Sequence, residues 1–236
     1  MPVPEPLFPH VRPAWRPVVT AADGPPGASK LAGTAWIPAG GAWPTCPNCG
    51  TPLQLLVQLD AATLPEAARG DYGEGLIQLF YCTSQEPLCE IDCEAFAPFS
   101  ESVVARLVVP EGVPEAEAPG IEGAFPPRRI VGWEAEDDYP HPEEAEARLG
   151  VALTDAEADA AWESGYPGVG DKLAGWPAWV QGIEYPECPR CGREMALVFQ
   201  IDSEDHLPIV FGDMGTGHLT QCPEHKDVLA FGWACT

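Results

Sequence analysis

Positive charge is scarce in this sequence. Its 236 residues include 12 Lys and Arg against 36 Asp and Glu, so the formal net charge at pH 7 is −24. Such a chain repels the phosphates of nucleic acids and of anionic lipid surfaces, and we expect neither nucleic acid nor a membrane as a partner. A basic molecule is attracted to it instead, so the expected partner is a protein of basic character.

Long apolar runs are also missing. The N-terminal stretch 1–19 has no continuous apolar segment of the kind found in secretory signals. No run approaches the roughly 18 apolar residues of a membrane span. These absences predict a cytoplasmic protein, in which the nine cysteines remain reduced thiols. Reduced cysteines favour metal ligation over a disulfide framework.

Familiar catalytic motifs are absent too. No serine lies in a GxSxG turn, and no Lys-Ser/Thr follows the glycine-rich turns "DYGEG" and "DMGTG" as a phosphate-binding loop requires. We therefore predict no catalytic and no cofactor-binding residues beyond metal ligands. The sequence favours a protein that is not an enzyme.

Proline and glycine, by contrast, are abundant. The 28 prolines and 24 glycines separate short apolar runs such as "LQLLVQLD" and "MALVFQID". Short runs rich in Leu, Val, Ile and Phe between turn residues are typical of strands rather than helices. The pattern predicts a β-rich protein.

The chain repeats itself. Residues 30–60 and 172–202 align at an offset of 142 without a gap, and 13 of the 31 positions are identical. Self-similarity of this kind indicates two copies of one structural unit. Gln58 and Gln200 recur near the ends of equivalent predicted strands, which indicates a structural hydrogen-bonding role.

The repeat also predicts how the chain is organised. Residues 1–110 form a first unit with an extended N-terminal arm, 111–165 an acidic connector with short helices, and 166–236 a second unit. The same offset of 142 pairs Gly75 of "DYGEG" with Gly217 of "DMGTG". The predicted fold class is α+β and β-rich, an internally duplicated, pseudo-two-fold arrangement of two antiparallel sheet units that each bear a zinc knuckle.

Within the acidic connector, two segments have helical character. "HPEEAEARLG" and "TDAEADAAWESG" both look like short helices, and in the second Thr154 is the expected N-cap with Glu157 completing a capping box. A further strand candidate, "RRIVGWEA", precedes them. We interpret this span as a charged surface connector.

Two five-residue turns carry the metal chemistry. "CPNCG" at 46–50 and "CPRCG" at 188–192 each place two thiolates within reach of one zinc ion, and the glycine accepts the positive φ that such a turn needs. Tetrahedral zinc takes two further ligands from a second turn. Aligning the two copies selects these ligands, and the predicted sets are Cys46, Cys49, Cys82 and Cys89 for the first ion and Cys188, Cys191, Cys222 and His225 for the second.

Two more cysteines remain as alternatives. Cys93 or Cys235 could replace one of these ligands, since each lies close in sequence to a predicted site. Both sites have four ligands dominated by thiolate, which is typical of closed, structural zinc rather than of catalytic zinc with an open position. The predicted cofactor is therefore two structural zinc ions.

Two histidines and two tryptophans of the second copy are further candidates. His206 and His218 could shuttle protons to the second site, although "SEDHLP" and "GTGHLT" look like turns. Trp176 and Trp179 in "AGWPAWVQG" could line a groove or belong to the core, and the sequence leaves both readings open.

The sequence resembles a known bacterial family. "DKLAGWPAWVQ", "LVFQIDSED", "GDMGTGHLTQC" and the closing "FGWAC" are similar to the YwqG-like family, a domain of unknown function. This resemblance implies a single compact domain and no established activity. The arrangement "CPNCGTPLQLLVQLD" followed by "LFYC" and a further cysteine resembles, more distantly, the eukaryotic programmed-cell-death-protein-two-like family. That resemblance implies a dedicated chaperone for a basic ribosomal protein.

Three functional hypotheses follow. The first is a protein-binding or chaperone-like module with structural zinc that captures a basic partner, supported by the acidity and by the distant resemblance. The second is an immunity protein that neutralises a basic toxin, because an acidic surface suits that role equally well. The third is a metallo-hydrolase that uses the second zinc site, which requires an open coordination position.

Overall fold

The computed structural model describes residues 2–114 and 118–236; residues 115–117 of the predicted connector lie outside the described part. Within these ranges the chain forms one ten-stranded sheet in the order β10-β9-β8-β7-β1-β6-β2-β3-β4-β5. The strands are β1 (Arg12–Thr20), β2 (Lys30–Leu31), β3 (Gln54–Asp60), β4 (Leu76–Tyr81), β5 (Val103–Val108), β6 (Arg128–Asp138), β7 (Lys172–Ala174), β8 (Ala196–Asp202), β9 (Thr216–Gln221) and β10 (Leu229–Ala234).

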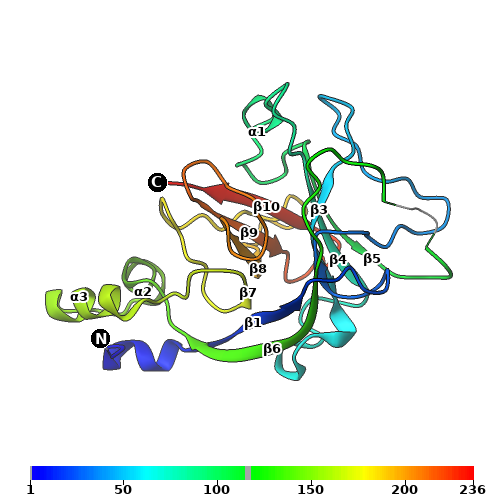
Figure 1. Ribbon diagram of the computed structural model, residues 1–236. Helices are drawn as coiled ribbons and strands as arrows, with labels where there is room; N and C mark the ends of the chain where they lie inside the picture. Colours follow the sequence, from blue (N-terminus) through cyan, green and yellow to red (C-terminus); the bar gives the residue numbers. More distant parts are fainter. Residues whose placement is uncertain (1, 115–117) are drawn as a thin grey trace.

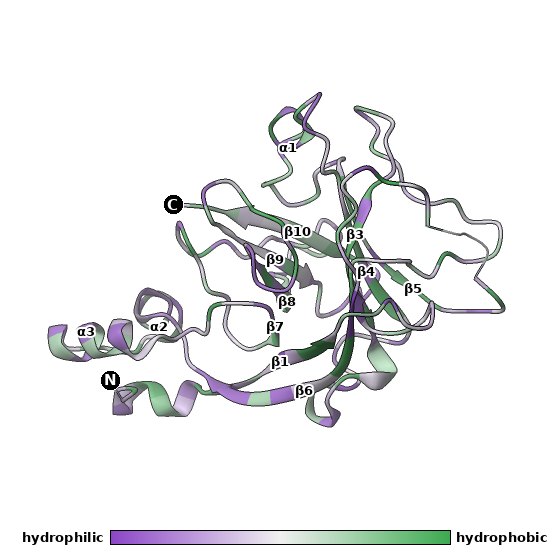
Figure 2. Cartoon of the chain, in the orientation of Figure 1, coloured by the Kyte–Doolittle hydropathy of each residue, from purple (hydrophilic) through white to green (hydrophobic). Residues whose placement is uncertain are grey.

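All neighbouring strands run antiparallel, and the sheet curls until its two edge strands β5 and β10 contact each other (Figure 1). The result is a near-barrel, so the predicted β-rich class is confirmed. The main hydrophobic core lies on one face of this sheet, with side chains from β3, β4, β8, β9 and β10. Figure 2 shows the hydrophobic residues gathered on these strands and more hydrophilic residues along β6 and the helices beside it.

Helices are few and short. The described ones are the 3-10 helices η1 (Glu5–His10), η2 (Ala61–Thr63) and η3 (Glu66–Ala68) and the α-helices α1 (Cys89–Asp92), α2 (Pro142–Leu149) and α3 (Asp155–Ser164). α2 and α3 coincide with the two helical segments predicted in the acidic connector. Thr154 and Glu157 form the predicted capping box, in which each side chain bonds to the backbone of the other residue.

The acidic segment is more than a surface connector. β6 lies inside it and occupies the centre of the sheet, where it pairs with β1 over the whole length of that strand. The sequence contains this strand as "RRIVGWEA", but its exposed acidic side chains disguise a central position. The predicted extended N-terminal arm is likewise a sheet strand, β1.

The strand order is symmetric about the central pair of β1 and β6. β2 to β5 lie on one side of the central pair and β7 to β10 on the other, in mirrored sequence order. The central strands exchange sides: β1, which precedes the first half, pairs with β7, and β6, which precedes the second half, pairs with β2. The two halves are therefore interlocked through the middle of the sheet.

Two buried glutamines repeat one hydrogen-bond network in both halves. Each accepts a backbone N–H on its side-chain oxygen and donates from its nitrogen to two backbone carbonyls. For Gln58 the partners are Trp36, Pro26 and Ala28, and for Gln200 they are Ala178, Gly168 and Gly170. Each partner of Gln200 stands 142 positions after the matching partner of Gln58. The predicted structural role of these glutamines is confirmed.

The predicted pairing of Gly75 with Gly217 is wrong. The carbonyl of Gly75 accepts from Ala61, and the carbonyl of Gly215 accepts from Ser203, the residue 142 positions after Ala61. Gly75 therefore corresponds to Gly215, at an offset of 140. The second half is two residues shorter before this point, which a gapless alignment cannot represent.

Each half also buries one lysine. Lys30 and Lys172 are fully buried, and their ammonium groups lie 2.6 Å from Asp23 and 2.8 Å from Asp138. Asp138 is fully buried as well and accepts backbone N–H groups from Gly168 and Trp176. A buried charge is tolerated only where such partners replace water. Asp138 thus ties the end of β6 to β7.

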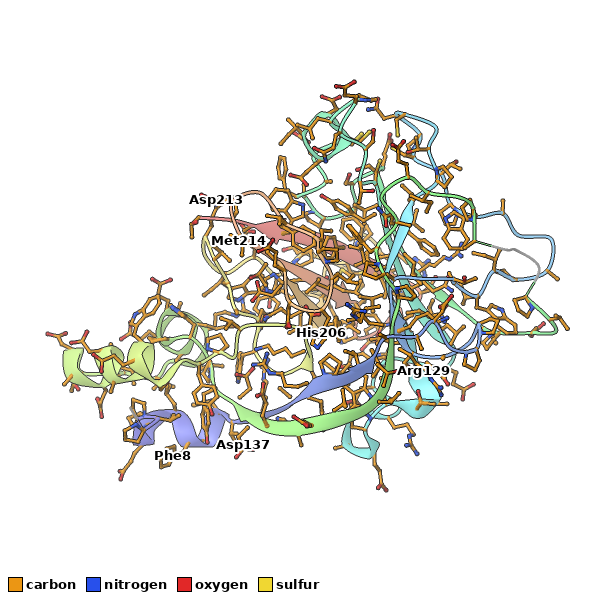
Figure 3. All side chains as sticks on the ribbon, in the orientation of Figure 1. Phe8, Arg129, Asp137, His206, Asp213 and Met214 are labelled. Carbon is orange, nitrogen blue, oxygen red and sulfur yellow. The ribbon has the colours of Figure 1, made fainter. Side chains whose placement is uncertain are left out.

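Loss of the Asp138 carboxylate should destabilise the fold strongly. Asp138→Ala leaves the buried Lys172 ammonium without its counter-ion, and we expect the free energy of unfolding to fall by roughly 3–5 kcal/mol, measured by urea denaturation. The neighbouring Asp137 is exposed (Figure 3), so Asp137→Ala is the matched control and should change stability little. Equal stability of the two variants would contradict this role of Asp138.

Candidate metal centres

The two CPxCG turns adopt the same backbone structure. In the first, the Cys46 N–H donates to Thr51 and its carbonyl accepts from Gly50, both at 2.8 Å. In the second, Cys188 makes the matching bonds with Arg193 and Gly192 at the same distances. Gly50 and Gly192 have φ values of +72° and +69°, a region that disfavours side chains. Each turn thereby holds two thiols on one side of a tight hairpin.

The first cluster combines this turn with residues that follow β4. Cys82 comes directly after β4, and Cys89 is the first residue of α1. The Sγ atoms of Cys46 and Cys89 lie 3.8 Å apart, and those of Cys49 and Cys82 lie 3.7 Å apart. All four sulfurs lie within 4.8 Å of one another. The structure brings the four predicted ligands of the first site together.

The second cluster has the same plan with one imidazole. Cys222 follows β9, and its Sγ lies 3.7 Å from that of Cys191. Nδ1 of His225 lies 3.8 Å from the sulfur of Cys188 and 3.7 Å from that of Cys222. These four donor atoms also lie within 4.8 Å of one another. The four predicted ligands of the second site are thus assembled around one point.

These spacings suit a single ion. Four sulfurs at about 2.3 Å from a central ion form a tetrahedron whose edges are about 3.8 Å. The measured separations match that edge in both clusters. Both clusters could therefore hold one tetrahedral metal ion each.

One thiol in each cluster ionises easily. Burial opposes ionisation of Cys49, but hydrogen bonds from Thr51 and from neighbouring thiols prevail and lower its pKa to about 6. Burial likewise opposes ionisation of Cys222, yet backbone N–H groups of His225 and Glu224 lower its pKa to about 6. Burial raises the pKa of Cys89 to about 11. Since the thiolate is the ligating form, Cys49 and Cys222 are ready to bind a cation at neutral pH.

Surrounding polar groups fix the ligand loops. The Asn48 amide donates to the sulfur of Cys89 at 3.4 Å. At the second cluster, Arg190 pairs with Asp227 and Arg193 with Glu224, which joins the CPRCG turn to the loop that carries Cys222 and His225. These two pairs are exposed and contribute little stability individually, but they orient the loop.

The two alternative cysteines take different places. Among the described residues, neither Cys93 nor Cys235 belongs to a group of donor atoms within 4.8 Å of one another. Cys93 follows α1 and packs beside the first cluster. Cys235 is half-buried at the end of β10, where its sulfur faces Gly212.

A third group of titratable side chains lies between β7 and the loop after β8, where Figure 3 shows His206. Nδ1 of His206 lies 2.9 Å from the buried carboxylate of Asp171 and 3.3 Å from Asp205. Asp171 also accepts from the Asp202 N–H, and Asp205 accepts from the Asp171 N–H. These bonds anchor the loop after β8 to the start of β7.

The sequence prediction missed Asp171 and Asp205. In the first half, Ser29 bonds to the Asp60 N–H and to Thr63, the same positions 142 residues earlier. In the second half, two aspartates stand at the positions of Ser29 and Thr63, and an alignment of the two halves shows this difference. His206 lies in a turn as expected, whereas His218 lies in β9 and is buried.

Fold and site together define a class of protein: a curled antiparallel sheet with two cysteine-rich clusters, each able to hold a metal ion. The family model described as "Domain of unknown function (DUF1963)" matches residues 29–225, which include every residue of both clusters, and the chain belongs to this family. The predicted YwqG-like resemblance is to this family and is confirmed. The more distant resemblance stays a prediction.

A relative is found in Salmonella typhimurium. It is named "Uncharacterized protein YpfL" and is 26% identical over 161 residues, which are 68% of this chain and 32% of that protein. The chain thus spans about a third of the length of this relative. Among the described residues, no helix is long and apolar enough to cross a membrane.

Removal of one ligand should empty one site only. Cys46→Ser breaks the first cluster, and we expect the metal content of the purified protein to fall by one ion per chain, measured by inductively coupled plasma mass spectrometry. Cys93→Ser is the matched control, because it removes a thiol beside the same cluster without removing a donor. A Cys93→Ser variant that also loses an ion would refute this ligand assignment.

The His206 ion pair predicts a pH dependence of stability. The hydrogen bond to Asp171 raises the pKa of His206, with Asp205 adding to the effect and burial and Arg128 opposing it. Because the folded-state pKa lies above the ordinary value of about 6.5, this contribution to stability is complete below that pH and is lost as the pH rises through the folded pKa. The difference in unfolding free energy between the native chain and His206→Gln should therefore shrink from pH 6 to pH 9. A constant difference across urea titrations at these pH values would contradict it.

Proposed function

We propose that each cluster holds one structural zinc ion and that the protein is a binding module, chaperone-like in action, for a basic protein partner. The donor sets support zinc, because thiolate with one imidazole in tetrahedral arrangement is its usual structural environment. Four donors at each site leave no open position, which favours a structural role over catalysis at the second site. The metallo-hydrolase hypothesis needs such a position.

We further propose that the two halves are copies of one unit that bears a zinc knuckle. The mirrored strand order, the matching networks of Gln58 and Gln200, and the two equivalent CPxCG turns support this interpretation. In each unit the zinc ion joins the CPxCG turn, which precedes β3 or β8, to the residues that follow β4 or β9. The ions thereby hold the walls of the binding surface.

The distribution of charge carries the proposal for a basic partner. Six of the 12 basic side chains are already engaged with carboxylates of the same chain: Arg16, Lys30, Arg148, Lys172, Arg190 and Arg193. Two of these are fully buried. Half of the positive charge is thus neutralised internally, and with 36 Asp and Glu in the chain the charge left to face solvent is mainly negative. A basic polypeptide is attracted to such a surface over long range.

The distant resemblance to the programmed-cell-death-protein-two-like family adds support, since that family implies a chaperone for a basic ribosomal protein. An immunity protein against a basic toxin would use the same electrostatic attraction. The identity of the captured partner separates these two roles. A ribosomal or other resident basic protein favours the chaperone, and a toxin favours the immunity protein.

Capture of the partner should depend on salt. The full chain, purified with its metal retained and immobilised, should recover a basic protein from lysate at 50 mM NaCl, to be identified by mass spectrometry. Its affinity, remeasured with purified partner by calorimetry, should fall on the order of tenfold between 50 and 500 mM NaCl because added ions screen the attraction. An empty capture at low salt, or an affinity independent of salt, contradicts the proposal.

A further inference from the structure

A cavity of about 470 Å³ opens beside the second metal cluster. Its floor is made by β9 and β10, with His218, Thr220 and Gly232, and its walls include Trp179 and Tyr185. Thr220 and Cys222 lie two positions apart, at the end of β9, and so face the same side of the sheet. The volume is within the range of about 300–1,000 Å³ that is typical of binding sites.

A buried carboxylate holds Trp179 and Tyr185 in place. The fully buried carboxylate of Glu144, on α2, accepts a hydrogen bond from the Trp179 indole at 3.2 Å and from the Tyr185 hydroxyl at 2.7 Å. The two rings meet edge to face with centroids 4.9 Å apart. Both rings therefore have their polar atoms satisfied, and they line the cavity in fixed orientations.

The floor contains an unsatisfied acceptor. Burial, together with the charge of Lys172, lowers the pKa of His218 to about 3, so its imidazole is neutral. One ring nitrogen hydrogen-bonds to the backbone of Ala178, as the Gln78 side chain does to the equivalent carbonyl of Trp36. Nε2 is buried and has no hydrogen-bond partner among the described residues. A buried polar atom of this kind is costly unless a donor reaches it.

The first half shows what fills the equivalent space. There Gln78 occupies the position of His218, and Arg106 on the neighbouring strand is its cross-strand partner. The Arg106 guanidinium donates to Gln78 at 2.9 Å and lies over the ring of Phe80 at 5.1 Å from its centroid. Trp43, the counterpart of Tyr185, meets Phe80 edge-on at 5.5 Å. An arginine and a phenylalanine thus close the site in that half.

Both of these side chains are missing in the second half. Register places Thr220 at the position of Phe80 and Gly232 at that of Arg106. A side chain at position 232 would meet the carbonyl oxygen of Phe96, so no arginine of β10 enters the cavity. Nε2 of His218 is therefore left without the donor that Arg106 supplies to Gln78 in the first half. The arginine of the first half therefore indicates the chemical group that the cavity of the second half can accept.

We propose that this cavity binds the guanidinium group of an arginine side chain on a basic polypeptide partner, which donates to Nε2 of His218 and lies against Trp179 and Tyr185. The inference rests on the proposed function and names the feature of the partner that is recognised. Planar guanidinium groups favour aromatic faces and directed donation, unlike a lysine ammonium. Glu184 lines the same cavity and adds negative charge, and Lys172 is neutralised by Asp138.

Three short peptides test this chemistry on the full-length, metal-loaded protein. They are acetyl-Gly-Arg-Gly-amide and the same peptide with citrulline or lysine in place of arginine, titrated while tryptophan fluorescence is recorded. Citrulline keeps the shape of arginine without its charge. We expect the arginine peptide to bind at least about tenfold more tightly than either of the others. Equal binding of arginine and citrulline peptides, or of arginine and lysine peptides, overturns the proposal.

Variants locate the binding to the cavity. Thr220→Phe introduces the side chain that stands at the equivalent position of the first half, and His218→Leu removes the acceptor while retaining bulk. Each variant should bind the arginine peptide at least about tenfold more weakly than the native chain does. Thr63→Phe is the control, because it adds the same ring at an exposed position of the first half, and its affinity should equal that of the native chain. If Thr220→Phe does not fold, as judged by circular dichroism, His218→Leu decides. Unchanged binding in the folded variant places the arginine elsewhere and overturns the proposal.

The two proposals fail separately. Salt-sensitive capture of a basic protein without any preference for the arginine peptide overturns this inference and leaves the proposed function standing. Selective binding of the arginine peptide with no basic protein captured from lysate supports the cavity and overturns the chaperone-like role.

Discussion

β1 and β6 pair at the centre of the sheet over the nine residues of β1. Along its other edge, each of these two strands pairs with the first strand of one half of the chain. β1 pairs with the second half and β6 with the first, so neither half has a complete sheet without a strand from the opposite side. The buried Asp138 at the end of β6 then joins Lys172 on β7. The other strands of the sheet lie on either side of this central pair, and each half holds one cysteine-rich cluster.

The two halves share one backbone framework and differ in some of the side chains on it. Gln58 and Gln200 bind the same backbone positions, and the CPxCG turns have the same hydrogen bonds, so the outer strands and metal clusters are held alike. Thr220 and Gly232 stand where the first half has Phe80 and Arg106, and a cavity lies beside them, lined also by two rings that Glu144 supports.

Much of the architecture could be predicted from the sequence, but only where a local signal exists. CPxCG turns, capping boxes and short apolar runs are specified within a few residues, and the repeat then related Cys82 to Cys222. The central strands could not be recognised in the same way. β1 contains two prolines, and β6 exposes Glu134 and Asp137, so they resemble an arm and a connector until their pairing is known. The group of Asp171, His206 and Asp205 forms only when the loop after β8 adopts its observed conformation. The two-residue offset at Gly75 can be recognised only from the observed strand register.

The crossed central strands have a consequence for how the chain is made. β2 cannot gain its neighbour β6 until residues 128–138 have left the ribosome, whereas every ligand of the first cluster lies between Cys46 and Cys89. Long-range pairing of this kind is slow and leaves strand edges open while it is awaited. An ion bound to the first cluster can meanwhile hold the loops around β3 and β4 together, since metal binding and local folding are coupled. A metal ion at the first cluster would therefore act before the sheet is complete as well as after it.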